Sequence, residues 1–326
     1  MAIELEETGS ALVARAIVRP RLMERGETSL WRDAARRLIR NRAAVVGLIV
    51  ISLLCLVTLT APWLAPYDYA AQDLAHVTAG PSAAHLLGTD QLGRDLLSRV
   101  IYGARISVSV GLIAQIILLL IGVPLGILAG YFGGWLDTLI MRVVDVLFAF
   151  PDLLFVILIM NYLRGALGNV RAGPFLFLVD LDTLTGGLLG VFVALGLTHW
   201  LTVARLVRGQ ILALREKEYV EAARSVGASD WRIMRTHLLP NTLAPVIVAA
   251  TFGIPQAIML EAGLSFLGLG VRPPMPSWGV MISEGVATLQ SYPHLLVVPA
   301  VALALTVLSF NFLGDGLRDA LDPWMK

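Results

Sequence analysis

Residues 106–130 read ISVSVGLIAQIILLLIGVPLGILAG, a stretch of 25 residues without a charged side chain. An α-helix needs about 20 consecutive apolar residues to cross a bilayer, so this stretch is long enough to span one. Gly122, Gly126 and Gly130 are spaced four residues apart and lie on one helix face, where a second helix can approach closely. The stretch therefore predicts a membrane-spanning helix that packs against a neighbour.

Other parts of the chain are apolar over a similar length. Of its 326 residues, 57% are hydrophobic and 15% are charged, whereas a soluble domain carries about a quarter charged residues. The least regular candidate contains Pro151, which kinks a helix in a way that a membrane bundle tolerates. We therefore expect an all-α integral membrane protein with six transmembrane helices. The candidate spans are 43–65, 106–130, 138–163, 186–204, 242–264 and 294–314.

Basic residues are distributed unevenly between the segments that join these spans. Nine Arg lie in residues 1–42, and seven Lys or Arg lie in residues 205–240. With six spans, both segments and the C-terminus share one side of the membrane, and the positive-inside rule makes that side cytoplasmic. Residues 66–105 and 164–185 then form extracytoplasmic loops.

The chain is expected to divide into three regions. Residues 1–42 form a cytoplasmic tail that ends in a basic amphipathic helix, over 29–42, lying in the membrane interface. Residues 43–105 contain the first transmembrane helix and a long extracytoplasmic loop. Residues 106–326 form the transmembrane core, which includes a cytoplasmic segment at 205–240.

The composition argues against several other classes of protein. The net charge of +1 indicates no nucleic-acid partner, and the single cysteine, Cys55, excludes internal disulfides and cysteine-rich metal sites. The five histidines are scattered, so we expect no catalytic residues. We also expect no metal site, because His85 and Asp90 offer too few ligands. Asp90 is expected instead to cap a surface helix that begins before Leu92.

The segment between the fourth and fifth spans is polar and patterned. It contains Glu221-Ala222-Ala223-Arg224-Ser225-Val226-Gly227-Ala228 and then His237-Leu238-Leu239-Pro240. We expect a short helix over 216–226 that ends at Gly227. A second helix, over 231–238, is expected to stop at Pro240. From spacing alone, this element is either an amphipathic connector or a docking site for another protein.

The segment 261–284 also departs from simple helical patterning. Its Gly and Pro residues are too frequent for one continuous helix. Glu261 stands at the end of the fifth span. An acid in that place is either a functional group or a cap that accepts backbone N–H groups, and the sequence leaves both interpretations open.

Four segments together resemble a known family. Glu221-Ala222-Ala223 with Gly227 and Leu239-Pro240 resembles the EAA loop of permease subunits of bacterial ABC importers, although His237 stands where the usual pattern has an aliphatic residue. The other three segments are LLGTDQLGRD at 86–95, LSFLGLG at 264–270 with PSWG at 276–279, and NFLGDGLRD at 311–319. Together, these segments resemble the second permease subunit of the dipeptide, oligopeptide and nickel importer family. The resemblance covers about residues 30–326.

This resemblance implies a type I ABC importer permease with the MetI-like fold. Such a permease pairs with a homologous permease, receives two ATPase subunits on its cytoplasmic face, and takes cargo from an extracytoplasmic substrate-binding protein. The chain contains no Gly-x4-Gly-Lys-Ser/Thr phosphate loop, so ATP and Mg are expected on the ATPase subunits. The chain itself is expected to be no enzyme and to bind no cofactor. The implied cargo is a peptide, with nickel chelates or another small solute as the alternative.

The resemblance also implies roles for individual residues. Gly227 would act as a joint and Glu221 as a contact in coupling to the ATPases. The full coupling set is Glu221, Ala222, Ala223, Gly227, Ala228, Leu239 and Pro240. Residues 265–279 are expected to form a loop that reaches toward the delivered substrate or plugs the outer mouth. The gate candidates are Glu261, Ser265, Phe266, Leu267 and Trp278.

A secondary transporter with inverted repeats is the main alternative of a different class. It requires similarity between the two halves of the chain and paired charges inside the membrane. The long loops at 66–105 and 205–240 do not correspond to each other, so the sequence favours the importer.

Overall fold

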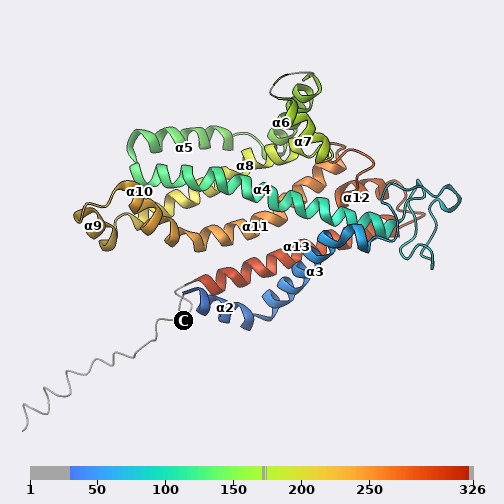
Figure 1. The fold of residues 1–326 in the computed structure, drawn as a ribbon, viewed down its shortest axis with the longest axis horizontal. Helices are drawn as coiled ribbons and strands as arrows, with labels where there is room; N and C mark the ends of the chain where they lie inside the picture. The colour runs from blue at the N-terminus through green and yellow to red at the C-terminus, as the bar shows by residue number, and fades with distance from the viewer. Residues whose placement is uncertain (1–29, 171–172, 174, 323–326) are drawn as a thin grey trace, which may run out of the picture.

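A computed structural model describes residues 30–170, 173 and 175–322, and the tail expected before residue 30 lies outside them. The described part consists of helices joined by loops (Figure 1), which confirms the all-α prediction. In chain order the elements are α2 (Leu30–Arg40), α3 (Arg42–Leu64), η1 (Leu74–His76), α4 (Leu96–Phe132), α5 (Gly134–Phe148), α6 (Asp152–Gly168), α7 (Leu176–Leu184), α8 (Leu189–Leu214), α9 (Glu218–Ser225), α10 (Asp230–Ile233), η2 (Met234–Leu238), α11 (Leu239–Phe266), α12 (Trp278–Val286) and α13 (His294–Leu321).

Within the described ranges, five continuous helices are long and apolar enough to cross a membrane: α3, α4, α8, the run from α10 through α11, and α13. A sixth span requires α5 and α6 together, and these two helices meet at an angle of 93°. The kink expected at Pro151 in the candidate span 138–163 is therefore present, as a sharp bend between two separate helices. Pro151 directly precedes α6, and the residue before a proline is biased away from helical geometry, so the chain turns there.

The contact between α4 and α8 is the most extensive between any two of the described helices. The glycine face predicted from the sequence makes this contact. A Cβ atom at Gly122 would lie 2.8 Å from the carbonyl oxygen of Trp200, and one at Gly126 would lie 2.7 Å from that of Ala204. Only glycine allows the two backbones to come this close.

A second pair of helices, α3 and α13, packs along the other side of the bundle (Figure 1). Gly47 allows this approach, because a Cβ atom there would lie 2.5 Å from the carbonyl oxygen of Ser309. Helix α2 rests against α13. Arg37 of α2 donates a hydrogen bond of 3.2 Å to the carbonyl oxygen of Asp322, just beyond the end of α13.

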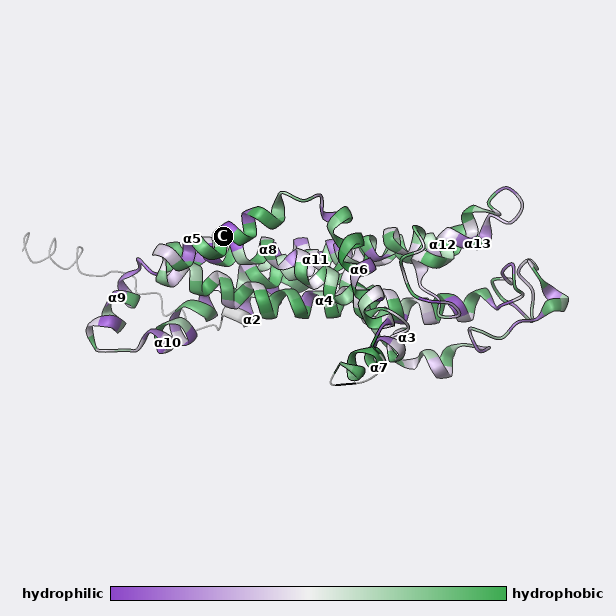
Figure 2. Ribbon diagram, turned by 90° about the horizontal axis from the view of Figure 1, so that it is seen from above, coloured by the Kyte–Doolittle hydropathy of each residue, from purple (hydrophilic) through white to green (hydrophobic). Residues whose placement is uncertain are grey.

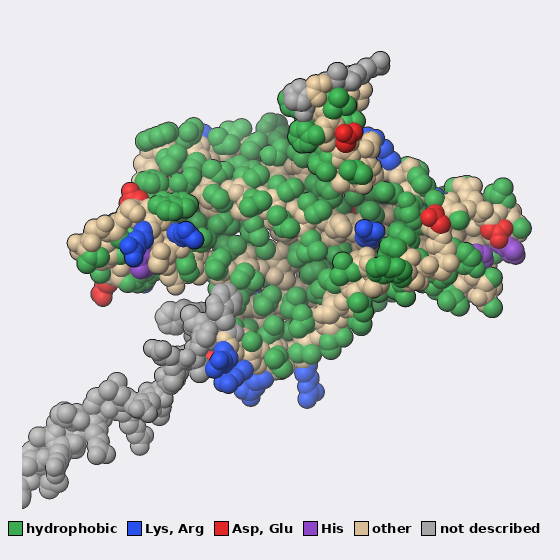
Figure 3. Space-filling view, viewed as in Figure 1, with side chains coloured by type: hydrophobic (Ala, Val, Ile, Leu, Met, Phe, Trp, Pro, Cys, Tyr) green, Lys and Arg blue, Asp and Glu red, His purple; other side chains and the backbone are tan. Residues whose placement is uncertain are grey.

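The surface of the bundle is apolar along its middle and polar at its ends (Figures 2 and 3). Large apolar side chains are exposed there, among them Leu59 at 75%, Leu120 at 70% and Leu158 at 64%. A soluble protein does not leave such a continuous apolar surface in water. The hydrocarbon of a bilayer can cover this surface without a free-energy cost, provided that the backbone N–H and C=O groups are paired within helices, as they are here.

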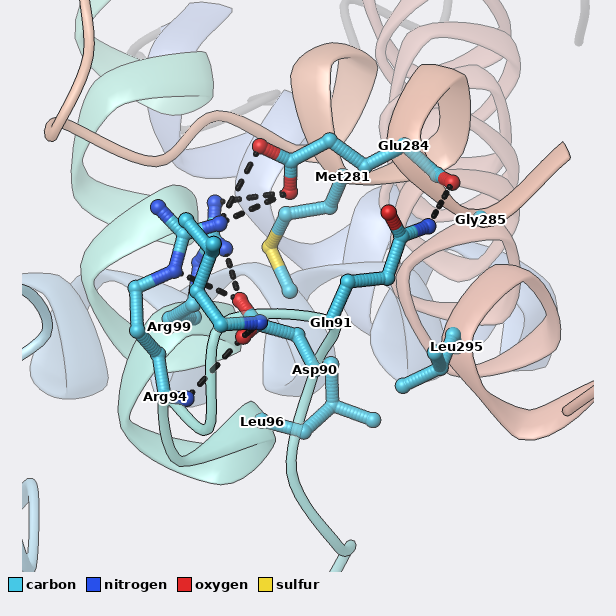
Figure 4. A pocket seen from close by; sticks show the side chains of 10 residues that line it. Asp90, Gln91, Arg94, Leu96, Arg99, Met281, Glu284, Gly285 and Leu295 are labelled. Carbon is cyan, nitrogen blue, oxygen red and sulfur yellow. Dashed lines mark hydrogen bonds and ion pairs between the residues drawn. The ribbon is translucent and has the colours of Figure 1, made fainter. Parts of the chain in front are cut away.

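A buried cluster of charges fixes the loop between α3 and α4 to the helix α12 (Figure 4). Asp90 accepts a hydrogen bond of 2.7 Å from Nε of Arg94 and is also bonded to Arg99. Both arginines reach Glu284 of α12, at 3.2 Å and 3.0 Å. Because each charge in the cluster faces a charge of opposite sign, the cluster can remain ionised although Asp90 and Arg99 are buried.

The expected role of Asp90 as a helix cap is wrong. The cap of α4 is Asp95, whose carboxylate accepts a hydrogen bond of 2.8 Å from the N–H of Ser98. Asp90 instead closes a turn, because its Oδ1 accepts from the N–H groups of Leu92 and Arg94. The intervening Gly93 has a φ of 74°, which prevents a helix from starting earlier.

We predict that Gly126→Ala destabilises the protein by about 1–3 kcal/mol, because the added methyl group forces α4 away from α8. The measurement is the thermal unfolding midpoint of the detergent-solubilised protein. Gly209→Ala in α8 is the matched control, because nothing lies within 4 Å of a Cβ atom there. Equal midpoints for the two variants would contradict the close packing described above.

We also predict that Asp90 makes the stability of the protein depend on pH in the acid range. Burial opposes ionisation of Asp90, but Arg99 and Arg94 outweigh that effect and hold its pKa below the ordinary value. The stabilisation is therefore complete at neutral pH and is lost as the pH falls below about 4, toward the folded pKa.

The variant that tests this is Asp90→Asn, for which we expect a loss of about 3 kcal/mol at pH 7, because the buried pairing is broken. Between about pH 5 and pH 3, its unfolding midpoint should fall less steeply than that of the unmodified protein. Asp180→Asn, at an exposed position, should leave the slope unchanged. Parallel slopes for Asp90→Asn and the unmodified protein would refute the assignment.

Candidate functional site

The segment 218–228, which we call the coupling segment, consists of α9 and the turn after it. Two acids, Glu218 and Glu221, lie in the first turn of α9, where negative charge is favoured by the helix dipole. The helix ends because Gly227 adopts a φ of 82°, a conformation that glycine adopts without strain. The N–H of Ala228 then donates to the carbonyl oxygen of Ala223 at 3.0 Å, which closes the turn.

The two faces of α9 have different surroundings. Val220 and Ala223 are buried in a core cluster that also contains residues of α4, α8, α10, η2 and α11. Glu221, Ala222 and Val226 are exposed, and Val226 is exposed to 84%. The two adjacent alanines of the motif therefore have different surroundings: Ala223 packs against the core of its own bundle, and Ala222 is exposed.

Three contacts join the end of α4 to the coupling segment and to the residues on either side of it. Within the segment, the guanidinium carbon of Arg224 lies 5.4 Å from the centre of the Tyr131 ring. After the segment, the hydroxyl of Tyr131 donates a hydrogen bond of 2.6 Å to Asp230, at the start of α10. Before the segment, Arg215 donates to the carbonyl oxygen of Gly130 at 3.0 Å. These contacts hold the segment and its flanking residues against the end of α4.

The expected stop at Pro240 is wrong. The helix that begins at α10 continues through η2, a single π-helical turn, into α11, and Pro240 lies in the first turn of α11. In the wide turn, the N–H of Leu239 donates to the carbonyl oxygen of Met234, five residues earlier. This local change of pairing, of the kind found as single turns inside α-helices, lets the helix pass the proline. Leu239 packs against the core and Pro240 is exposed.

The gate candidates lie at the opposite end of α11, where a buried carboxylate organises them. Glu261 is fully buried and accepts hydrogen bonds from the hydroxyls of Ser265 at 2.6 Å and Ser107 at 3.4 Å. The Ser265 hydroxyl also lies 3.3 Å from that of Ser277. The partners of Glu261 are thus hydroxyl groups, and not the backbone N–H groups of the capping interpretation. This carboxylate joins α4, α11 and the loop that precedes α12.

The remaining gate candidates separate into buried and exposed residues. Trp278 is buried, and its indole N–H donates to the carbonyl oxygen of Val100 in α4 at 3.1 Å. Phe266 and Leu267 are exposed to 50% and 54%. Glu261, Ser265 and Trp278 therefore hold the loop in place, whereas Phe266 and Leu267 present an apolar surface.

The structure brings together residues that the sequence reasoning did not connect. Arg94, Arg99 and Glu284 form one cluster with Asp90, although Glu284 lies about 190 residues away in the chain. The spacing of an acid and two arginines at 90, 94 and 99 was visible in the sequence. Their partner on α12 was not, because no local pattern indicates which helix packs there.

Comparison with known proteins places the chain in a family. Residues 122–326 match the family model described as "Binding-protein-dependent transport system inner membrane component", and residues 29–81 match "N-terminal TM domain of oligopeptide transport permease C". The first match alone covers more than half of the chain.

Several curated relatives are similar over nearly their whole length. The chain is 40% identical to the glutathione transport system permease protein GsiD of Pectobacterium atrosepticum over 308 residues, covering 94% of this chain and 95% of the relative. It is 43% identical to the dipeptide transport system permease protein DppC of Bacillus subtilis over 305 residues, covering 93% and 89%. It is 42% identical to the oligopeptide transport system permease protein OppC of Bacillus subtilis over 298 residues, covering 91% of each.

A solved structure supports the fold. The chain superposes on a chain of the MetNI methionine ABC transporter in an inward-facing conformation with a TM-score of 0.50 and 19% identity, covering 70% of this chain and 98% of that one. At this identity the likeness concerns the fold alone. Taken together, the family models and the curated relatives show that this chain belongs to the family of binding-protein-dependent transport system inner membrane components, as an OppC- and DppC-like ABC importer permease.

Proposed function

We propose that the chain is one of two homologous permease subunits of an ABC importer for peptides, and that the coupling segment receives an ATPase subunit. The named relatives carry dipeptides, oligopeptides or glutathione, all of which contain peptide bonds. This favours a peptide cargo over a nickel chelate. ATP and Mg are bound by the two ATPase subunits, and a substrate-binding protein delivers the cargo.

The observation that carries this proposal is that α9 has one face exposed and the other face buried against its own bundle. Ala222 and Val226 are exposed beside Glu221, while Val220 and Ala223 are buried in a core cluster shared with α4, α8, α10 and α11. An amphipathic helix with one face in its own bundle and small residues on the other fits a groove on a partner. Force applied to such a helix is passed to the bundle, because the helix cannot slide over it.

The orientation in the membrane follows from charge. The basic residues of α2 and of the segment around α9 lie toward the same end of the bundle, as Figures 1 and 3 show. Arg94 and Arg99 lie toward the other end, but both are neutralised by Asp90 and Glu284. The positive-inside rule therefore makes the α9 end cytoplasmic and leaves both termini on that side.

Movement of the coupling segment can be transmitted along α4 to the opposite end of the helix bundle. At the C-terminal end of α4, Tyr131 contacts Arg224 of the coupling segment and Asp230 just after it. In its N-terminal part, Ser107 and Val100 accept hydrogen bonds from Trp278, at the end of the loop 265–279. When the ATPases close, α9 and α4 move as one body, and the far end of α4 displaces the loop held by Glu261. Phe266 and Leu267 would then open or close the outer mouth.

We predict that Glu221→Lys lowers peptide uptake by at least about tenfold, because placing like charges together at an interface costs several kcal/mol. The side chain is exposed, so the amount of folded permease should not change. The measurement is ATP-dependent uptake of a labelled dipeptide into proteoliposomes that contain all subunits.

Asp319→Lys is the matched control, because it makes the same charge change at an exposed position of α13, outside α9. It should transport at the unmodified rate. Equal uptake by Glu221→Lys and Asp319→Lys would contradict the proposed docking face.

A further inference from the structure

The loop between α3 and α4 brings together three side chains that can bind a metal ion. Asp73, His76 and His85 each offer one ligand atom, and these atoms lie within 4.8 Å of one another. The pairing of His85 with Asp90 considered from the sequence is not formed, since Asp90 faces Arg94 and Arg99. Histidine and acidic side chains gather at this end of the molecule in Figure 3.

His85 is held in the way that metal-binding histidines are held. It is buried, and its Nδ1 lies 2.9 Å from Oδ1 of Asp95. The other oxygen of Asp95 is engaged by the N–H and the hydroxyl of Ser98. Nδ1 therefore carries the proton, and Nε2 is the nitrogen left with a free lone pair. A carboxylate behind a histidine is the usual second partner of a histidine ligand to zinc.

Asp73 and His76 lie on one short turn of the loop. Oδ1 of Asp73 caps η1 by accepting from the N–H of Ala75 at 3.0 Å, and its Oδ2 lies 2.7 Å from Nδ1 of His76. Both side chains are largely exposed, at 45% for Asp73 and 60% for His76, and a metal ion can reach them from water.

The two ligand-bearing segments are joined through their backbones. The N–H of Asp73 donates to the carbonyl oxygen of Gly93 at 3.1 Å. The Thr89 hydroxyl donates to the carbonyl oxygen of His76 and accepts from the N–H of Ala79 at 2.9 Å. A Cβ atom at Gly93 would lie only 2.0 Å from the carbonyl oxygen of Asp73. The loop is thus built so that the η1 turn stays beside His85.

We propose that Asp73, His76 and His85 bind one Zn²⁺ ion, with water as the fourth ligand. Two imidazole nitrogens and one carboxylate oxygen match the ligand preference of zinc, and three protein ligands leave one position of its tetrahedron open. The site lies in a loop outside the membrane-spanning helices. The ion would therefore have a structural role, stabilising the loop, and would not be part of the transported cargo. It would join the η1 turn to the Asp95 cap at the start of α4.

The test uses the complete importer complex, purified in detergent on a tag without histidine and freed of metal with a chelator. Co²⁺ is the probe, because a tetrahedral cobalt site with nitrogen ligands absorbs visible light. We expect one Co²⁺ ion per copy of this chain, displaced by one equivalent of Zn²⁺. His76→Ala should lose this absorption, and Asp95→Asn should weaken binding by about 10–100-fold.

Asp68→Asn is the control, because it removes an exposed carboxylate from the same loop. It should bind cobalt as the unmodified protein does. The exposure of His76 makes a folding defect in His76→Ala unexpected, and its gel-filtration profile checks this. If the unmodified complex and His76→Ala bind equal amounts of cobalt, the three side chains form a hydrogen-bonded cluster only and the proposal is overturned. The readout is independent of transport, so it does not depend on the proposed function.

Discussion

The close approach of α4 and α8 is the contact on which the other features of the structure depend. Gly122, Gly126 and Gly130 let the backbone of α4 touch the carbonyl oxygens of α8. The coupling segment follows directly after α8, and the core that holds it is shared by both helices. If the two helices separated, Val220 and Ala223 would lose the surface on which they are buried. The glycine face in the membrane thus determines where a helix outside the membrane is held.

Polar side chains fix each end of α4 to a different neighbouring segment. At one end, the hydroxyl of Tyr131 fixes the start of α10. At the other end, arginines and acids neutralise one another next to α12. Between them, Glu261 is buried and is bonded to serine hydroxyls from two other parts of the fold. Each arrangement pairs buried polar groups within the protein, because hydrocarbon offers them no partner, although Nε of Arg99 is left without a hydrogen bond.

Features set by local composition could be predicted from the sequence, and features set by packing partners could not. The apolar windows, the glycine face and the end of α9 at Gly227 follow from residues close together in the chain. Asp90 and Asp95 are equally good caps by type, and Arg99 and Glu284 decide between them. Pro240 alone predicts a helix end, but a π-helical turn before it carries the helix on. The exposure of Ala222 and the burial of Ala223 also depend on the surface beneath α9, which no short motif describes.

The central claim is that α9 presents its exposed face to an ATPase subunit while its buried face moves with α4 and α8. Cysteine cross-linking in the assembled importer tests it most directly, in a Cys55→Ser background that removes the single native thiol. We expect Val226→Cys to form an adduct that contains an ATPase subunit. Leu184→Cys, exposed to 78% on α7 far from α9, should form none. Absence of an ATPase adduct with Val226→Cys, or the same adduct with Leu184→Cys, would contradict the account.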